Sequence, residues 1–109
     1  MEAYRILAIN PGSTSTKVAM FEDETCLLKQ TVNHSAEQLA DFSTVSDQLP
    51  YRLETVLQVL NEKGIRLEGT DAFVGRGGGL QSCSGGVYRV NTVMLQHASS
   101  GKYGGNHPA

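Results

Sequence analysis

The sequence predicts a mixed α/β fold, in which a three-strand antiparallel meander is followed by a crossover helix and a strand parallel to the meander. Two observations carry this prediction. Three short apolar runs follow one another through short links in the first third of the chain, and a helical apolar period then separates them from a fourth run. Because a parallel crossover needs about a dozen residues, the short links predict antiparallel neighbours, and the long link predicts a parallel strand.

The three N-terminal runs each read as a strand bounded by turn residues. The first, 5–9, ends at Asn10-Pro11-Gly12, and the second, 17–21, ends at an acidic turn over 22–24. The third run covers 26–32. Together they predict the meander.

A helix is predicted from Leu49 up to Gly64. Apolar residues recur at i, i+4, i+7, i+8 and i+11, which places one stripe on a helix: Leu49, Leu53, Val56, Leu57 and Leu60. Pro50 suits a first turn, Lys63 complements the helix dipole, and Gly64 suits the position after the C-cap.

The remaining elements are shorter. Residues 71–74 predict the fourth strand, which we expect to be buried and to lie parallel to the first. A helical turn is expected near 37–42, a short strand over 87–90, and a helix over about 92–99 that Asn91 caps.

Composition limits the class of protein. The 109 residues allow one domain with a modest core, and 39% apolar with 18% charged residues is typical of a folded, soluble chain. A net charge of −2 with scattered basic residues argues against nucleic acid as a partner, and no apolar run approaches the roughly 20 residues of a membrane helix. Without a secretory pattern, and with Cys26 and Cys83 far apart, we expect a cytoplasmic protein with free thiols.

The end of the chain predicts truncation. The last residues, Asn106 to Ala109, follow a glycine-rich stretch and do not resemble a closing element. The predicted sheet would also keep an uncovered edge, which intact proteins usually cover or pair. We therefore expect residues 1–109 to be part of a larger domain.

The link between the first two strands is the main candidate site. It reads Asn10-Pro11-Gly12-Ser13-Thr14-Ser15-Thr16-Lys17. We expect Gly12 to allow a tight turn with positive φ, the hydroxyls and backbone N–H groups to converge on an anion, and Lys17 to add a positive charge. This combination favours the phosphates of a nucleotide. An ordinary hydroxyl-rich hairpin turn is the alternative.

Arg76 and His107 are the other candidates. Arg76 follows the fourth strand between glycines, where a guanidinium could bind a carboxylate or phosphate through two parallel hydrogen bonds. The alternative is a surface arginine in a loop. His107 stands alone near the end of the chain, and a lone histidine is more often incidental than catalytic. We interpret His34 and His97 as structural or solvated.

Residues 6–23, with INPGSTSTKVAMFED at their centre, resemble the start of the butyrate kinases, which belong with the acetate kinases in the superfamily of actin, sugar kinases and heat-shock ATPases. Three later stretches agree in order: FVGRGGGL, GGVYRVNTVML and KYGGNHPA. The Asn-Pro-Gly-Ser-Thr-Ser-Thr-Lys turn is similar to that of the butyrate and branched-chain kinases, whereas acetate kinases usually have Asn-Ala-Gly-Ser-Ser-Ser.

The resemblance implies a ribonuclease H-like (actin-like ATPase) domain with strand order 3-2-1-4-5, and two such domains around a cleft. Residues 1–109 would be part of the N-terminal one, and the full-length protein would be a homo-oligomer. The resemblance also implies site residues: Asn10, Ser13, Ser15 and Lys17 at the phosphates, Arg76 on the acyl carboxylate or the moving phosphoryl group, and His107 on that phosphoryl group.

The implied reaction is in-line transfer of a phosphoryl group from ATP to a short-chain carboxylate, which gives an acyl phosphate and ADP, with Mg²⁺ bridging the nucleotide phosphates. In the family pattern the metal ligands, a second arginine and the adenosine pocket lie beyond Ala109, so we expect residues 1–109 alone to be inactive. Two alternatives stay open: an acetate or propionate kinase, and a non-enzymatic domain that only binds phosphate.

Overall fold

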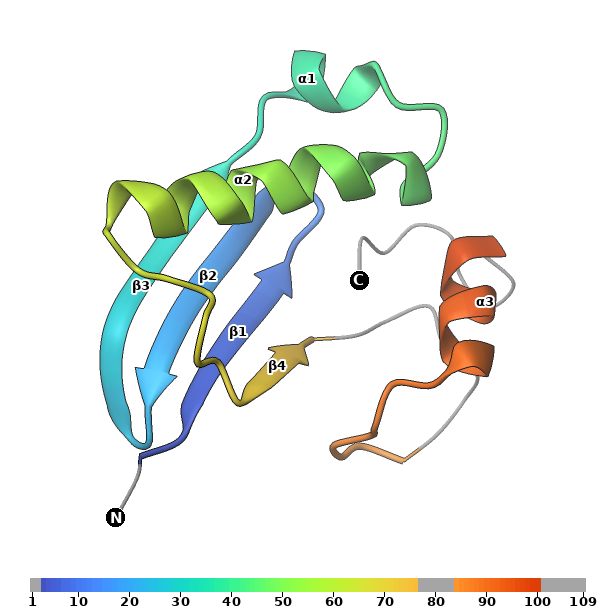
Figure 1. The fold of residues 1–109 in the computed structure, drawn as a ribbon. Coiled ribbons are helices and arrows are strands. Elements are labelled where there is room, and N and C mark those ends of the chain that lie inside the picture. Colours follow the sequence, from blue (N-terminus) through green and yellow to red (C-terminus); the bar gives the residue numbers. More distant parts are fainter. Residues whose placement is uncertain (1–2, 77–83, 101–109) are drawn as a thin grey trace.

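The structure is a computed structural model that describes residues 3–76 and 84–100 (Figure 1). These residues form an open, four-stranded mixed sheet in the order β3-β2-β1-β4, with helix α2 across one face. The elements in chain order are β1 (Arg5–Pro11), β2 (Ser15–Glu22), β3 (Thr25–Asn33), α1 (Ala36–Ala40), the 3-10 turn η1 (Ser46–Gln48), α2 (Leu49–Glu62), β4 (Ala72–Gly75) and α3 (Thr92–Ser100).

The predicted strand pairing is confirmed. β1 pairs antiparallel with β2, and β2 pairs antiparallel with β3. β4 pairs parallel with β1, as the crossover through α2 requires. The mixed α/β class is therefore established, whereas the ribonuclease H-like identity stays a prediction from the resemblance.

The two faces of the sheet differ in burial. Side chains alternate between the faces along each strand, and those on the α2 side form the core. The buried apolar residues of this core are Leu7, Val18, Met20 and Leu28 from the sheet and Val56, Val59 and Leu60 from α2. The opposite face, here called the open face, carries Ala8, Asn10, Lys17 and Ala19, which are half-buried or exposed.

The buried stripe of α2 differs from the predicted one. Arg52, Val56, Val59 and Leu60 are buried, whereas three residues of the predicted stripe are exposed: Leu49, Leu53 and Leu57. The helix is rotated about its axis because Arg52 enters the interior and binds the β1–β2 link. The prediction therefore located the helix correctly but assigned its buried side only in part.

The C-terminal end of α2 confirms the prediction for Gly64, which adopts a φ of 67°. Its N–H donates to the carbonyl of Asn61 (3.1 Å), and the N–H of Ile65 donates to that of Leu60 (2.9 Å). These two bonds form a Schellman motif, which satisfies carbonyls that the helix leaves unpaired.

Both shorter helices are capped by side chains. Ser35 and Gln38 form a reciprocal capping box at the start of α1. Asn91 accepts a hydrogen bond from the N–H of Met94 (2.9 Å) at the start of α3, as predicted. No helix in the described parts of the chain combines the length and the apolar character that crossing a bilayer requires.

Two predictions near the C-terminal part are wrong. β4 is exposed along its whole length, and Phe73 exposes 64% of its surface, because no other described element covers this strand on the side away from β1. Residues 87–90 are exposed and irregular instead of forming a strand. A short apolar run forms a strand only where a neighbouring strand completes its hydrogen bonds, and the described residues supply none at 87–90.

Candidate anion-binding site

The link between β1 and β2 is a tight turn in which Gly12 and Ser15 are in close contact. The N–H of Gly12 donates to the carbonyl of Ser15 (2.7 Å). A β-carbon at position 12 would lie 2.9 Å from Oγ of Ser15, closer than such atoms approach in real structures. Gly12 does not have a positive φ, so that expectation is wrong. The turn needs glycine here because of the close approach of Ser15.

The tip of the turn leaves hydrogen-bond donors free. Ser13 and Thr14 are exposed, and neither their hydroxyls nor their backbone N–H groups bond to another described residue. The carbonyl of Thr14 is held by the N–H of His34 (2.8 Å), which ties the turn to the end of β3. The turn therefore has a fixed backbone and unused donors, as an anion site requires.

Three polar side chains lie in a row across the sheet beside this turn. Asn10 of β1 is paired with Lys17 of β2. On its other side, Gly75 of β4 is paired with Ile9, and the N–H of Arg76 donates to the Ile9 carbonyl (3.1 Å). Arg76 therefore directly follows the last paired residue of β4, at the end of the sheet where Asn10 lies on β1.

The row lies on the open face. Paired residues on neighbouring strands project to the same side, so Lys17 and Asn10 share the face opposite α2, and the same alternation continued one residue past the end of β4 would place Arg76 there too. β1 and β4 are parallel, and both end at the same edge of the sheet (Figure 1). Adjacent strands are about 4.8 Å apart, so the outer side chains of the row can reach one small anion beside Asn10.

The row carries two uncompensated positive charges. Lys17 and Arg76 are exposed, and neither forms an ion pair with any other described residue. A negatively charged ligand at this edge of the sheet would balance them.

Arg52 of α2 binds the other side of the turn, although its side chain is only 6% exposed. Its Nη1 donates to the carbonyl of Ser15 (2.8 Å) and to Oγ1 of Thr16 (3.1 Å). Its Nη2 donates to the carbonyl of Ser13 (3.2 Å), and its Nε donates to Oε1 of Gln48 (3.0 Å). The guanidinium thus holds both ends of the turn from inside the domain.

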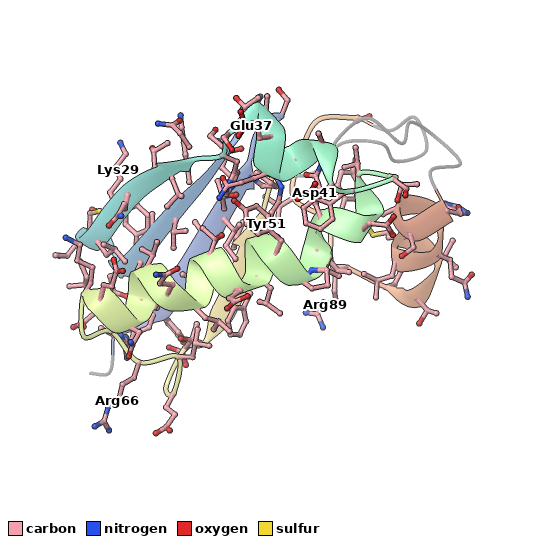
Figure 2. The ribbon with its side chains drawn as sticks, turned by 90° about the horizontal axis from the view of Figure 1, so that it is seen from above. Lys29, Glu37, Asp41, Tyr51, Arg66 and Arg89 are labelled. Atoms are coloured by element: carbon pink, nitrogen blue, oxygen red, sulfur yellow. The ribbon has the colours of Figure 1, made fainter. Side chains whose placement is uncertain are left out.

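A chain of hydrogen bonds continues from Thr16 to α1. Oγ1 of Thr16 is 2.8 Å from Nε2 of His34, and Nδ1 of His34 is 2.9 Å from Oη of Tyr51. Tyr51, which lies between α1 and α2 in Figure 2, donates to Oε1 of Gln38 (3.1 Å). Because Tyr51 donates its only proton to Gln38, its Oη accepts from Nδ1 of His34, which assigns the imidazole proton to Nδ1.

Electrostatics agree with a neutral His34. Burial, and then the nearby charge of Arg52, lower the pKa of His34 below its usual range. Burial also lowers the pKa of Arg52, an effect that Tyr51 partly offsets. His34 is therefore a structural histidine, as predicted, whose role is to orient Thr16.

The structure thus describes six of the seven candidate site residues: Asn10, Gly12, Ser13, Ser15, Lys17 and Arg76. All six lie in the turn or in the row beside it. His107 lies outside the described residues. Within 3–76 and 84–100, no three His, Cys, Asp or Glu side chains are grouped so as to hold a metal ion.

Sequence reasoning missed Arg52, and it counted the Thr16 hydroxyl among the anion donors, whereas Thr16 is buried and bonds to Arg52 and His34. A signal for Arg52 existed, since it shares a helix face with Val56 and Val59 at i+4 and i+7. An arginine inside an apolar stripe indicates a polar partner in the interior.

No protein-family model matches the chain. The assignment to the butyrate kinases therefore stays a prediction from the sequence motifs.

Proposed function

We propose that this chain forms the phosphate-binding part of a kinase that transfers a phosphoryl group between ATP and a short-chain carboxylate, of the butyrate kinase type. The observation that carries the proposal is the row of Lys17, Asn10 and Arg76 beside a turn with unused hydroxyl and amide donors. Two cations and several neutral donors at one edge of a sheet suit a phosphoryl group better than a neutral ligand.

In the proposed reaction, a carboxylate oxygen attacks the γ-phosphorus of ATP. A new bond forms between that oxygen and phosphorus, and the bond to the β–γ bridging oxygen breaks, so that ADP leaves with the electron pair. The turn and Lys17 would bind phosphate oxygens, and Arg76 would hold the carboxylate or the moving phosphoryl group. The protein's contribution is position and charge balance, which supply most of the rate in such transfers.

The described residues contain no group of three or more His, Cys, Asp or Glu side chains that could hold Mg²⁺ by themselves. We propose a cytoplasmic, homo-oligomeric enzyme without nucleic-acid or membrane partners, and this follows from composition and resemblance.

Phosphate binding without transfer is a second candidate. It is favoured by the exposure of Lys17 and Arg76 on the open face, because phosphoryl transfer to a carboxylate needs a site that excludes water. An acetate or propionate kinase remains an alternative within the first candidate.

The anion site can be tested in the 109-residue protein by amide NMR during titration with inorganic phosphate at constant ionic strength. We expect the signals of Ser13, Thr14 and Lys17 to shift together, with a Kd of about 1 mM, because the described residues supply only part of a phosphate site. If these signals do not respond up to tens of millimolar phosphate, both candidate functions are wrong.

Transfer is tested by trapping acyl phosphate with hydroxylamine in the presence of ATP, Mg²⁺ and acetate, propionate or butyrate. We expect no product from residues 1–109, and product with a preference for butyrate from a longer protein that contains them. If a longer protein binds phosphate but forms no acyl hydroxamate with any of these acids, the second candidate is favoured.

A further inference from the structure

We propose that Arg52 is a positioning residue of the anion site, whose buried charge is balanced by the bound anion. This inference rests on the proposed phosphate site and extends it to a side chain that does not touch the ligand. It begins from an imbalance of charge. Arg52 is buried, yet its four hydrogen bonds all go to neutral acceptors on Ser13, Ser15, Thr16 and Gln48.

Buried cations in proteins are normally paired with a carboxylate, because desolvation of a lone charge is costly. Arg52 has no such partner among the described residues. Burial lowers its pKa, which is the direction expected when the charged form lacks full compensation. An anion bound at the turn would supply the missing compensation.

The backbone of the turn connects the guanidinium to the anion site. The carbonyl of Ser13 points towards Nη2 of Arg52 (3.2 Å). All peptide bonds in the described residues are trans, so the N–H of Thr14 in the same peptide points the opposite way, out of the interior. This N–H has no partner among the described residues and is free to donate to an anion.

The peptide between Ser13 and Thr14 therefore has a guanidinium at its carbonyl end and an open donor at its amide end. A cation at the carbonyl strengthens the donor at the other end, since hydrogen bonds in series polarise one another. Arg52 thus acts on the anion in two ways: it fixes the direction of the Thr14 N–H, and it makes that group a stronger donor.

The fork of the guanidinium matters as well as its charge. Nη1 and Nη2 hold the carbonyls of Ser15 and Ser13, two residues apart. A lysine ammonium is a point charge on a flexible stem and does not hold two carbonyls in a fixed geometry. Arg52→Lys should therefore keep the positive charge but hold the two carbonyls less well in position. Arg52→Gln should lose both the charge and this geometry.

The test is titration of the 109-residue protein with inorganic phosphate, followed by the amide signal of Thr14, for wild type and variants. We expect Arg52→Gln to weaken binding about tenfold or more and Arg52→Lys by about threefold. Arg66→Gln removes the same charge from an exposed position that points away from the domain in Figure 2. It should stay within about twofold of wild type.

A folded Arg52→Gln protein that binds phosphate as tightly as wild type would overturn the proposal. Wild-type affinity in Arg52→Lys would show that the fork plays no part, and the positioning role would be wrong. If the Thr14 signal does not respond even in wild type, the phosphate site itself fails. The failure of this inference is therefore distinguishable from the failure of the proposed function.

If Arg52→Gln does not fold, the wild-type protein still gives an answer. The Nε–H group of Arg52 is held by Gln48 and can be followed as a side-chain NMR signal. We expect this signal to shift on addition of phosphate, with the same Kd as Thr14. A signal that does not change while Thr14 saturates would overturn the proposal.

Discussion

Thr16 and His34 share a hydrogen bond of 2.8 Å, in which the Thr16 hydroxyl donates to Nε2 of a neutral imidazole. Tyr51 gives its only proton to Gln38, so its Oη accepts from Nδ1 of His34, and Nε2 of the neutral ring is left to accept from Thr16. Protonation of His34 would put a second donor, besides Arg52, against the Thr16 oxygen and a second positive charge near Arg52. The neutral histidine is thus the form that fits the hydrogen bonds to Thr16 and Tyr51.

This relationship predicts a pH-dependent stability. Because the pKa of His34 is lowered in the folded state, the unfolded chain binds a proton more readily below its own pKa of about 6.5. The contribution of His34 to the unfolding free energy is therefore largest above about pH 6.5. It falls as the pH drops towards the lowered pKa of the folded state, by at most about 1.4 kcal/mol per pH unit.

The measurement is urea unfolding between pH 7.5 and 5 for wild type and His34→Gln. The difference in unfolding free energy between the two proteins should decrease as the pH is lowered, because the groups that both proteins share contribute equally to each. A difference that stays constant over this range would contradict a neutral, buried His34.

Arg76→Ala should separate function from stability. The Arg76 side chain is exposed, and its backbone N–H keeps its bond to Ile9 in any variant, so we expect a change in unfolding free energy within about 0.5 kcal/mol. In a longer protein with acyl-phosphate activity, kcat/KM should fall by the equivalent of about 2–5 kcal/mol. Arg66→Ala is the matched control, and near-normal activity of Arg76→Ala would remove Arg76 from the site.

Gly12→Ala should destabilise the protein through Ser15. The new β-carbon would meet Oγ of Ser15 at 2.9 Å, whereas the next contact, with the Ser15 carbonyl, is an ordinary 3.6 Å. We expect a loss of about 1 kcal/mol. The loss should largely disappear when Gly12→Ala is made in a Ser15→Ala background, as a double-mutant cycle by urea unfolding would show. An undiminished loss would mean that the backbone, not Oγ, resists the substitution.

The orientation of α2 predicts a contrast between two leucines. Leu60 is 2% exposed in the core, and Leu60→Ala should cost about 2–5 kcal/mol of unfolding free energy. Leu53 is 51% exposed, and Leu53→Ala should change the unfolding free energy by no more than about 0.5 kcal/mol. Equal losses in thermal or urea unfolding would show that Leu53 is covered in solution.

The strands could be predicted because their signals are local. Each of the three apolar runs in the meander ends in turn residues, and the lengths of the links decide the direction of pairing. The same reasoning placed Asn10 and Arg76 at one edge, because a crossover helix makes β4 parallel to β1. The apolar run over 87–90 looks like a strand by the same criterion, but no described strand pairs with it. A short run of sequence does not show whether such a partner exists.

The spacing of apolar residues alone could not decide which side of α2 is buried. Two overlapping stripes fit the helix, one with Leu53 and Leu57 and one with Arg52 and Val59. The second is buried because the carbonyls of the turn accept hydrogen bonds from Arg52, a contact between residues 37 and 39 positions apart. The role of Gly12 was hidden for a similar reason, since only the folded turn shows how close Oγ of Ser15 comes.

The long sequence separation of the Arg52 contacts also bears on the order of folding. The β1–β2 hairpin joins residues close in sequence and closes a small loop, so it can form early, whereas Arg52 reaches Ser13 and Ser15 only when α2 docks on the sheet. In an intermediate with the hairpin formed and α2 undocked, every residue of the turn would be present, but its carbonyls would not yet be held by Arg52. The anion site is therefore among the last features of the domain to be completed.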